Sequence, residues 1–341
     1  MAEAFTDPVP VTLNGKPAEL PPGQSLLAHL VARGVDPARV VVAINREIVP
    51  RARWSDLYPA AGDRLEVVHV VAGGSGPGAG LEPDDDPLVI AGVSFRSRLI
   101  CGTGKFADAA TMTAAHAAAG AEMVTVAVRY FDLDLGGHSL LGELDPRRHR
   151  LLPNTAGAYT AEDALHMAEL GRAATGTNWV KLEVIGDKES LWPDVAATVE
   201  ACRELVRRGF VVLPYTAPDP VAAVRLEEAG AATVMPLGSP IGSGQGVLDV
   251  AAVRRIVGRV HVPVVVDAGI GSPSDAALAM EAGASAVLVN TAIARAEDPV
   301  AMARAMRLAV VAGRLGHRAG RIPRREEATP STTTAGVPHL E

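Results

Sequence analysis

A lysine and a glutamate lie two residues apart in TNWVKLEVIGD, residues 177–187. The segment has the apolar character of a buried strand, in which alternate side chains point to the same side. If the sheet closes into a barrel, Lys181 and Glu183 point into it. A lysine amine kept from water has a lowered pKa and becomes a nucleophile, which would form a Schiff base with a ketone or aldehyde. Glu183 is then placed to transfer the protons that this reaction moves.

The same pair could instead be an internal ion pair without chemistry, and the pattern alone favours neither interpretation. Later segments favour chemistry: LGSPIGSGQG at 238–247, VVVDAGIGSPSD at 264–275 and LVNTAIA at 288–294. Glycine amides beside helix starts after the last two strands of a barrel commonly bind phosphate. These segments predict a phosphorylated substrate. Asp267 is expected to point inward from the end of its strand, rather than to serve only in a turn or cap.

The elements that must position these residues alternate regularly over residues 88–323. Short apolar strand candidates are separated by Ala-rich helical stretches that end in glycine. Eight such strands predict an α/β fold, a (β/α)8 TIM barrel, whose active sites lie at the carboxyl ends of the strands. Residues 131–150 have weak helical character and are expected to form an irregular insert.

Residues 1–74 predict a second, smaller domain. VPVTLNGKPAEL alternates and turns at Asn14-Gly15, QSLLAHLVARG is a short amphipathic helix, and RVVVAINREIVPR and DRLEVVHVV are strands. This order is typical of a β-grasp, ubiquitin-like α+β domain. Residues 75–87, rich in Gly, Pro and Asp, predict a flexible linker, and residues 324–341 a disordered tail.

Composition argues against several classes of protein. The net charge of −7, without a basic stripe, argues against a nucleic-acid partner. No apolar run is long enough for a bilayer, and the N-terminus lacks the features of a secretory signal, so no membrane partner is expected. The two cysteines, Cys101 and Cys202, indicate a reducing compartment, which we interpret as the cytoplasm. The histidines form no metal-like cluster, and GTGK at 102–105 lacks the spacing of a nucleotide-binding loop.

Several long motifs occur in the order found in one family. WVKLEVIGD, VVLPYT, VMPLGSPIGSGQG, VPVVVDAGIG and AVLVNTAIA resemble bacterial thiazole synthase, which builds the thiazole ring of thiamine, over residues 88–323. LNGKP, VVVAINREIVPR and GDRLEVV, followed by GG, resemble the ubiquitin-like sulfur carrier of the same pathway. The chain thus resembles a carrier–synthase fusion. The resemblance implies condensation of 1-deoxy-D-xylulose 5-phosphate, dehydroglycine and the sulfur of a carrier thiocarboxylate, without a metal or an organic cofactor.

The resemblance also implies roles for individual residues. Lys181 matches the Schiff-base lysine, and Glu183 and Asp267 match acidic residues that transfer protons. Further matches, to the contacts of the sugar phosphate, are Gly242, Ala268, Gly269, Asn290 and Thr291. A homo-oligomer and an adenylyltransferase that activates the carrier are implied as well.

The end of the carrier segment departs from the family pattern. A carrier ends at its second glycine, whose carboxylate becomes the thiocarboxylate, whereas Gly73 and Gly74 are followed here by Ser75. Either the chain is cleaved after Gly74, which the glycine-rich linker favours, or the tethered carrier is inactive and sulfur comes from elsewhere. For the barrel, the alternatives are another Schiff-base aldolase or isomerase for a different sugar phosphate, or a scaffold that carries a ubiquitin-like tag.

Overall fold

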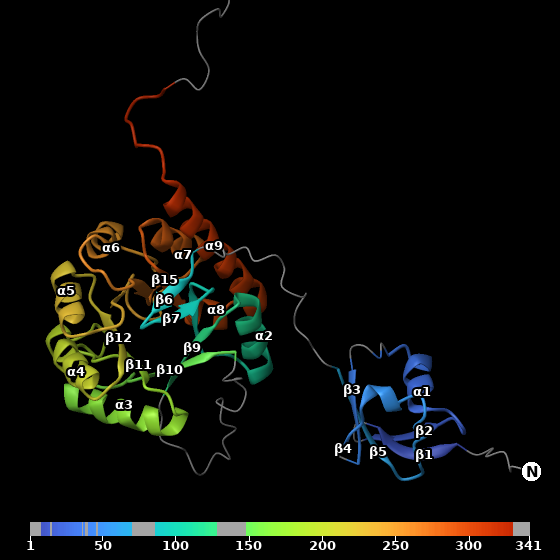
Figure 1. Ribbon diagram of the computed structural model, residues 1–341. Coiled ribbons are helices and arrows are strands. Elements are labelled where there is room, and N and C mark those ends of the chain that lie inside the picture. Colours follow the sequence, from blue (N-terminus) through green and yellow to red (C-terminus); the bar gives the residue numbers. More distant parts are fainter. Residues whose placement is uncertain are drawn as a thin grey trace, which may run out of the picture. The chain divides into compact units, whose positions relative to one another are not determined.

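The computed structural model describes residues 8–13, 16–35, 37, 40–45, 47–69, 86–127 and 148–329. The chain divides into two compact units, Met1–Pro77 and Gly78–Glu341 (Figure 1). The boundary between the units falls within the predicted linker, of which residues 75–85 lie outside the described part. Most of the predicted insert at 131–150, the Asn14-Gly15 turn and residues 330–341 of the tail also lie outside it.

The first unit is a five-stranded sheet with one helix. Its elements are β1 (Val9–Leu13), β2 (Lys16–Leu20), α1 (Leu26–Ala32), β3 (Val40–Ile44), β4 (Glu47–Ile48), the 3-10 turn η2 (Arg51–Arg53) and β5 (Arg64–His69). The strand order is β2-β1-β5-β3-β4, with β1 and β5 parallel and the other neighbours antiparallel. Leu26 and Leu30 of α1 pack with Val42, Trp54 and Leu65 in one core. The predicted β-grasp domain is confirmed.

The second unit is an eight-stranded parallel sheet in the order β13-β12-β11-β10-β9-β8-β15-β14. Bridges between Val234 and Val264 and between Leu237 and Asp267 join its two ends, so the sheet closes into the predicted TIM barrel. The strands are β8 (Leu99–Gly102), β9 (Met123–Ala127), β10 (Arg150–Asn154), β11 (Trp179–Leu182), β12 (Val211–Thr216), β13 (Met235–Pro236), β14 (Val265–Asp267) and β15 (Ala286–Val289).

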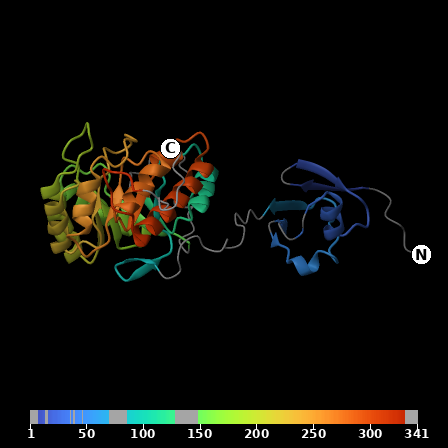
Figure 2. The same ribbon diagram turned by 90° about the horizontal axis from the view of Figure 1, so that it is seen from above.

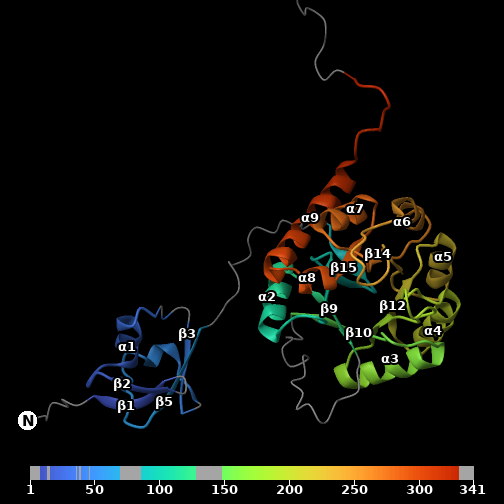
Figure 3. The same ribbon diagram turned by 180° about the vertical axis from the view of Figure 1, so that it is seen from behind.

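Helices surround the closed sheet, as the view from behind shows (Figure 3). They are α2 (Ala109–Ala119), α3 (Ala161–Thr175), α4 (Val195–Arg207), α5 (Pro220–Glu228), α6 (Val250–Val257), α7 (Pro273–Glu281), α8 (Thr291–Ala294) and α9 (Pro299–Ala319). Aspartates cap most of them, because a carboxylate accepts the amide hydrogens that the first turn leaves without partners. These caps are Asp108, Asp194, Asp219, Asp249 and Asp298.

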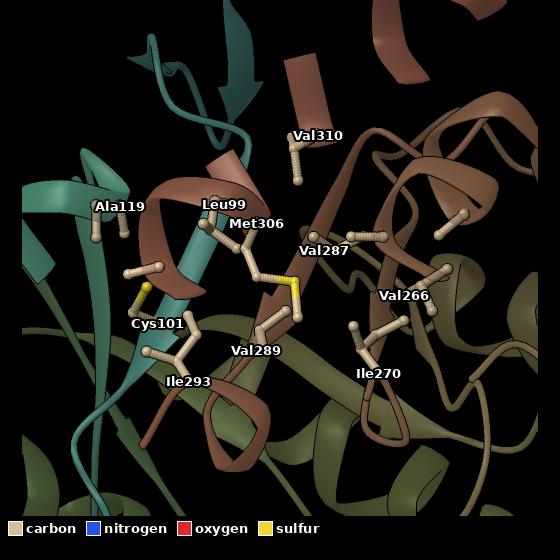
Figure 4. Close-up of a cluster of buried hydrophobic side chains, with 14 of the residues drawn as sticks. Leu99, Cys101, Ala119, Val266, Ile270, Val287, Val289, Ile293, Met306 and Val310 are labelled. Carbon is tan, nitrogen blue, oxygen red and sulfur yellow. The ribbon is translucent and has the colours of Figure 1, made fainter. Parts of the chain in front are cut away.

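Alternation along the strands separates an inner from an outer core. Trp179 of β11 packs inside the barrel with Leu152 and Leu213, whereas Val180 and Leu182 pack outward against the helices. The outer core between the strands and α2, α7 and α9 contains Leu99, Cys101, Val266, Ile270, Val287, Val289, Met306 and Val310 (Figure 4). Both Cys101 and Cys202 are buried free thiols.

A hairpin closes the end of the barrel where the strands begin. It is formed by β6 (Leu88–Ile90) and β7 (Val93–Phe95), and Figure 2 shows it in teal at one end of the barrel. Leu88, Ile90 and Phe95 are buried in the inner core. The Phe95 ring meets the Trp179 ring edge-on, with 5.9 Å between centroids. The interior is therefore apolar and filled at this end, and polar side chains concentrate at the other.

Helix α9 packs so closely against α7 that we can predict how substitutions of its glycines change stability. A Cβ on Gly313 would lie 2.5 Å from the Ala277 carbonyl oxygen and 2.8 Å from Met280 Cβ, whereas a Cβ on exposed Gly316 would find Glu281 no closer than 3.9 Å. We expect Gly313→Ala to lower the free energy of unfolding by about 1–3 kcal/mol. Gly316→Ala should raise it by about 0.5–1 kcal/mol, because alanine favours the helix. Equal midpoints for the two variants in thermal unfolding followed by circular dichroism would contradict this packing.

Candidate active site at the carboxyl end of the barrel

The buried ammonium of Lys181 lies between two carboxylates. It donates a hydrogen bond to Glu183 Oε1 at 2.8 Å, and its Nζ lies 2.7 Å from Asp267 Oδ2. The three side chains are only 4–7% exposed. The contact with Asp267 is a close ion pair between two buried charges. The structure thus brings together the three residues predicted to be catalytic.

Neighbouring strands hold Glu183 and Asp267 in place. Glu183 follows β11, and Thr155, after β10, both accepts the Glu183 amide hydrogen and donates to its carbonyl, each at 2.8 Å. Asp267 ends β14, and its carbonyl accepts the Gly238 amide at 3.0 Å. Because the backbone on both sides is hydrogen-bonded, the two carboxylates face Lys181 from fixed positions.

The charges in this cluster shift two pKa values. Burial lowers the pKa of Lys181, but the attraction of Asp267 and Glu183 outweighs this and raises it above its ordinary value. The sequence-based expectation of a lowered lysine pKa is therefore wrong for the unliganded site. Burial raises the pKa of Asp267, and Lys181 offsets this only in part. Asp267 is accordingly suited to take the proton that Lys181 must lose before it can attack a carbonyl.

Tyr215 is a site residue that the sequence analysis missed. Its ring centroid lies 5.5 Å from Lys181 Nζ, and its hydroxyl donates to the Leu191 carbonyl at 3.5 Å. It packs with Ile185 and Leu237 as an apolar wall at the barrel mouth. Burial raises the pKa of its phenol, with Asp267 adding to the effect. Strand alternation could have found it, since Tyr215 is two residues after inward-facing Leu213 of β12.

The loops after β13 and β14 are packed backbone against backbone. The Gly246 amide donates to the Gly269 carbonyl at 2.8 Å. Gly269 has φ +75, and a Cβ there would lie 1.9 Å from Ser239 Oγ, so only glycine fits. Gly242 also has a positive φ of 75°, and Ala268 adopts φ 65° although it is not glycine. The three predicted contacts of the sugar phosphate on these loops, Gly242, Ala268 and Gly269, thus lie where the barrel opens.

The remaining two predicted contacts follow β15. Asn290 is the residue before α8 and Thr291 is its first residue. Asn290 lies against β8, because a Cβ on Gly102 would be 2.7 Å from Asn290 Cβ. Its side-chain oxygen is buried and has no hydrogen-bond partner in the described chain. An unpaired buried acceptor is costly, so a hydrogen-bond donor beside this oxygen would be stabilising.

One part of the expected anion site is already occupied by the protein. The Asp275 carboxylate accepts the amide hydrogens of Gly271 and Ser272 at 3.1 and 2.9 Å. Those two amides at the start of α7 are therefore engaged, and a phosphate would have to use residues earlier in the loop. The expectation of bare amides after the seventh strand therefore does not hold for Gly271 and Ser272.

Other kinds of site find little support. Within the described ranges, no group of three or more His, Cys, Asp or Glu residues could hold a metal ion. Among the described helices, none has the length and apolarity needed to cross a membrane. Gly73 and Gly74, the predicted carrier terminus, lie outside the described residues.

Comparison with known families gives this site a context. The profile of the family described as thiazole biosynthesis protein ThiG matches residues 89–333, and that of the ThiS family matches residues 11–74. The chain belongs to the ThiG family. Its ThiG barrel includes the closing hairpin, all eight strands and every predicted catalytic residue, and its ThiS domain coincides with the β-grasp unit. The predicted fusion of a sulfur carrier with a thiazole synthase is confirmed at the level of these families.

Individual relatives agree with this assignment. The ThiG barrel is similar to a Methylobacterium sp. protein named thiazole synthase, 58% identical over 258 residues, covering 75% of this chain and 97% of the relative. A thiazole synthase of Paramagnetospirillum magneticum is 45% identical over 328 residues, covering 96% of this chain and 99% of the relative. That alignment extends over most of the ThiS segment as well as the barrel. Among solved structures, an Amycolatopsis orientalis BexX/CysO complex matches at 39% identity and TM-score 0.65, covering 71% of this chain and all of the other.

Proposed function

We propose that the barrel is a thiazole synthase that condenses 1-deoxy-D-xylulose 5-phosphate, dehydroglycine and a carrier-borne sulfur through an imine on Lys181. The observation that carries this proposal is one buried amine between two carboxylates at the mouth of a ThiG-family barrel. Relatives that align with most of this chain are named thiazole synthases. No other lysine of the described chain is buried, which leaves one candidate for the imine.

Imine formation requires Lys181 to lose a proton first. Asp267, whose pKa is raised by burial, accepts this proton, and the neutral amine attacks the ketone carbon of the sugar phosphate. The carbon–nitrogen bond forms, the carbonyl oxygen becomes a hydroxyl, and the proton returns to it so that water leaves. Glu183, hydrogen-bonded to Lys181, then moves protons between neighbouring sugar carbons, which shifts the carbonyl along the chain.

Sulfur enters after the carbonyl has moved. The carrier's thiocarboxylate sulfur bonds to the new carbonyl carbon, and the acyl group passes from sulfur to the former carbonyl oxygen. The carrier then leaves as its carboxylate with that oxygen, and sulfur stays on the sugar. The sulfur adds to the imine carbon of dehydroglycine, and the amine formed there displaces Lys181 from its imine, which closes the ring and frees the lysine. Gly242, Ala268, Gly269, Asn290 and Thr291 hold the sugar phosphate throughout, supported by their common position at the mouth. The apolar wall with Tyr215 excludes water from the imine. These steps need no metal or organic cofactor.

The rest of the chain supplies the sulfur once cleavage after Gly74 has freed the carboxylate that becomes the thiocarboxylate. We propose residues 1–74 as the carrier domain ending at Gly73 and Gly74, 75–87 as the linker, 88–323 as the synthase and 324–341 as the tail. An adenylyltransferase activates the carrier, and the enzyme works as a cytoplasmic homo-oligomer. The two buried free thiols fit a reducing compartment.

Reductive trapping tests the imine directly. Borohydride added to the full chain with 1-deoxy-D-xylulose 5-phosphate should fix the sugar on the peptide that contains Lys181, as seen by peptide mass spectrometry. The same experiment with other sugar phosphates separates a thiazole synthase from an aldolase or isomerase. Labelling of a different lysine, or trapping with every substrate except this one, would overturn the proposal.

A further inference from the structure

Lys105 lies at the same mouth as the predicted contacts of the sugar phosphate, although its GTGK segment lacks the spacing of a nucleotide-binding loop. It follows β8 and is exposed. Its side chain reaches the loop after β13, since a Cβ on Gly242 would be 3.6 Å from Lys105 Nζ. A segment from the first barrel strand thus presents an amine to a loop that follows the sixth.

The backbone holds Lys105 in a specific and strained conformation. Its φ is +70°, in the left-handed region that is unfavourable for a residue other than glycine. The preceding loop is anchored, because Thr103 Oγ1 donates to the buried Thr125 carbonyl at 3.1 Å. A Cβ on Gly104 would be 3.4 Å from Asn290 Nδ2. The loop therefore also lies against Asn290, which is a predicted contact of the sugar phosphate. The fixed backbone of this loop therefore directs the Lys105 side chain toward the loop that contains Gly242.

A phosphate group bound at the Gly242 loop would be stabilised by a cation that the Lys181 cluster does not provide. Lys181 is flanked by two carboxylates, so that cluster offers no net positive charge to a phosphate dianion. Across the described ranges, Lys105 has no carboxylate within 4.0 Å and its ammonium is uncommitted. A phosphate at the Gly242 loop would therefore meet one available ammonium from the GTGK segment.

We propose that Lys105 is an additional substrate-binding residue whose ammonium closes onto the phosphate group of the sugar at the Gly242 loop. The inference rests on the proposed function, since it names a further ligand for the same substrate. Because Lys105 is exposed, its amine can move away when the phosphate enters and return over it. The contact recognises the phosphate monoester and leaves the chemistry at Lys181 unchanged.

The test compares substitutions of Lys105 in the full chain. Lys105→Met should raise KM for 1-deoxy-D-xylulose 5-phosphate about 10- to 100-fold, the effect of losing one charge-assisted hydrogen bond, with kcat within about threefold. Lys105→Arg should keep KM within about fivefold, since it retains the charge. The affinity for inorganic phosphate, measured by calorimetry, should fall with KM in Lys105→Met. Borohydride trapping at saturating substrate should still label Lys181.

Lys188→Met is the matched control. Lys188 is an exposed lysine on the loop after β11, with its ammonium 4.6 Å from the Tyr159 ring centroid, at the same end of the barrel. The Lys188→Met substitution removes the same charge, but from a side chain that rests on Tyr159 instead of reaching the Gly242 loop. An equal rise in KM for both variants would show long-range attraction and overturn the proposal, as would unchanged KM and phosphate affinity in Lys105→Met. Failure of wild-type trapping with intact phosphate binding at Lys105 would overturn the proposed function alone.

Discussion

Lys181→Arg is expected to abolish thiazole formation while the barrel stays folded. The guanidinium keeps a positive charge between Glu183 and Asp267, so neither carboxylate is left buried without a partner. It cannot form an imine, because it stays protonated and its nitrogen lone pairs are delocalised. We expect turnover to fall by about 10⁴-fold or more, as when an enzyme loses its covalent nucleophile. The measurement is product formation with the sugar phosphate, dehydroglycine and carrier thiocarboxylate.

The same substitution at an exposed lysine provides the control. Lys188→Arg changes a side chain that rests on the Tyr159 ring and should leave turnover unchanged. Thermal unfolding of both variants establishes that loss of activity is not loss of fold. Retention of more than a tenth of wild-type turnover by Lys181→Arg would exclude an imine on this residue.

Asp267→Asn is expected to slow imine formation by about 10²- to 10⁴-fold, the range for removal of a general acid–base group. The amide keeps the size of the carboxyl but cannot take the Lys181 proton. In the wild type, burial raises the pKa of Asp267. As pH falls through that raised pKa, Asp267 becomes protonated and imine formation slows. The Asn variant should lack this decline, which single-turnover borohydride trapping across a pH series would measure.

Asp249→Asn serves as the control for this second substitution. Asp249 caps α6 by accepting the Ala252 amide at 2.7 Å, and it lies outside the cluster around Lys181. Asparagine caps helices about as well as aspartate, so rate and pH profile should match the wild type. A decline at low pH that persists in Asp267→Asn would assign the proton transfer to another group.

Strand alternation predicted much of this site from sequence. Lys181 and Glu183 had to share the inner face once Val180 and Leu182 faced the helices, and barrel closure then set Asp267 opposite them. The pKa of Lys181 could not be predicted in this way. Its sign depends on Asp267, three strands away around the sheet, and a one-dimensional pattern gives burial but not the distance between charges.

Residues on loops were harder to predict than those on strands. Lys105 reaches Gly242 through a left-handed backbone conformation that no periodicity indicates. Asp275 takes two amides that the glycine pattern had suggested for phosphate, because a capping carboxylate at this position folds back on the preceding loop. Both features depend on loop geometry rather than on which side a strand presents.

The hairpin β6–β7 fills one end of the barrel with Leu88, Ile90 and Phe95. This has a consequence for the order in which reactants would bind. Because apolar side chains fill that end of the described barrel, we expect the reactants and products of the proposed reaction to pass through the opposite, carboxyl end. A thiocarboxylate tail of a carrier protein, inserted at the carboxyl end of the barrel, would block this route for small molecules while it is bound. Under the proposed function, the ketose would then have to bind before the sulfur donor, and the thiazole product would leave only after the donor dissociates.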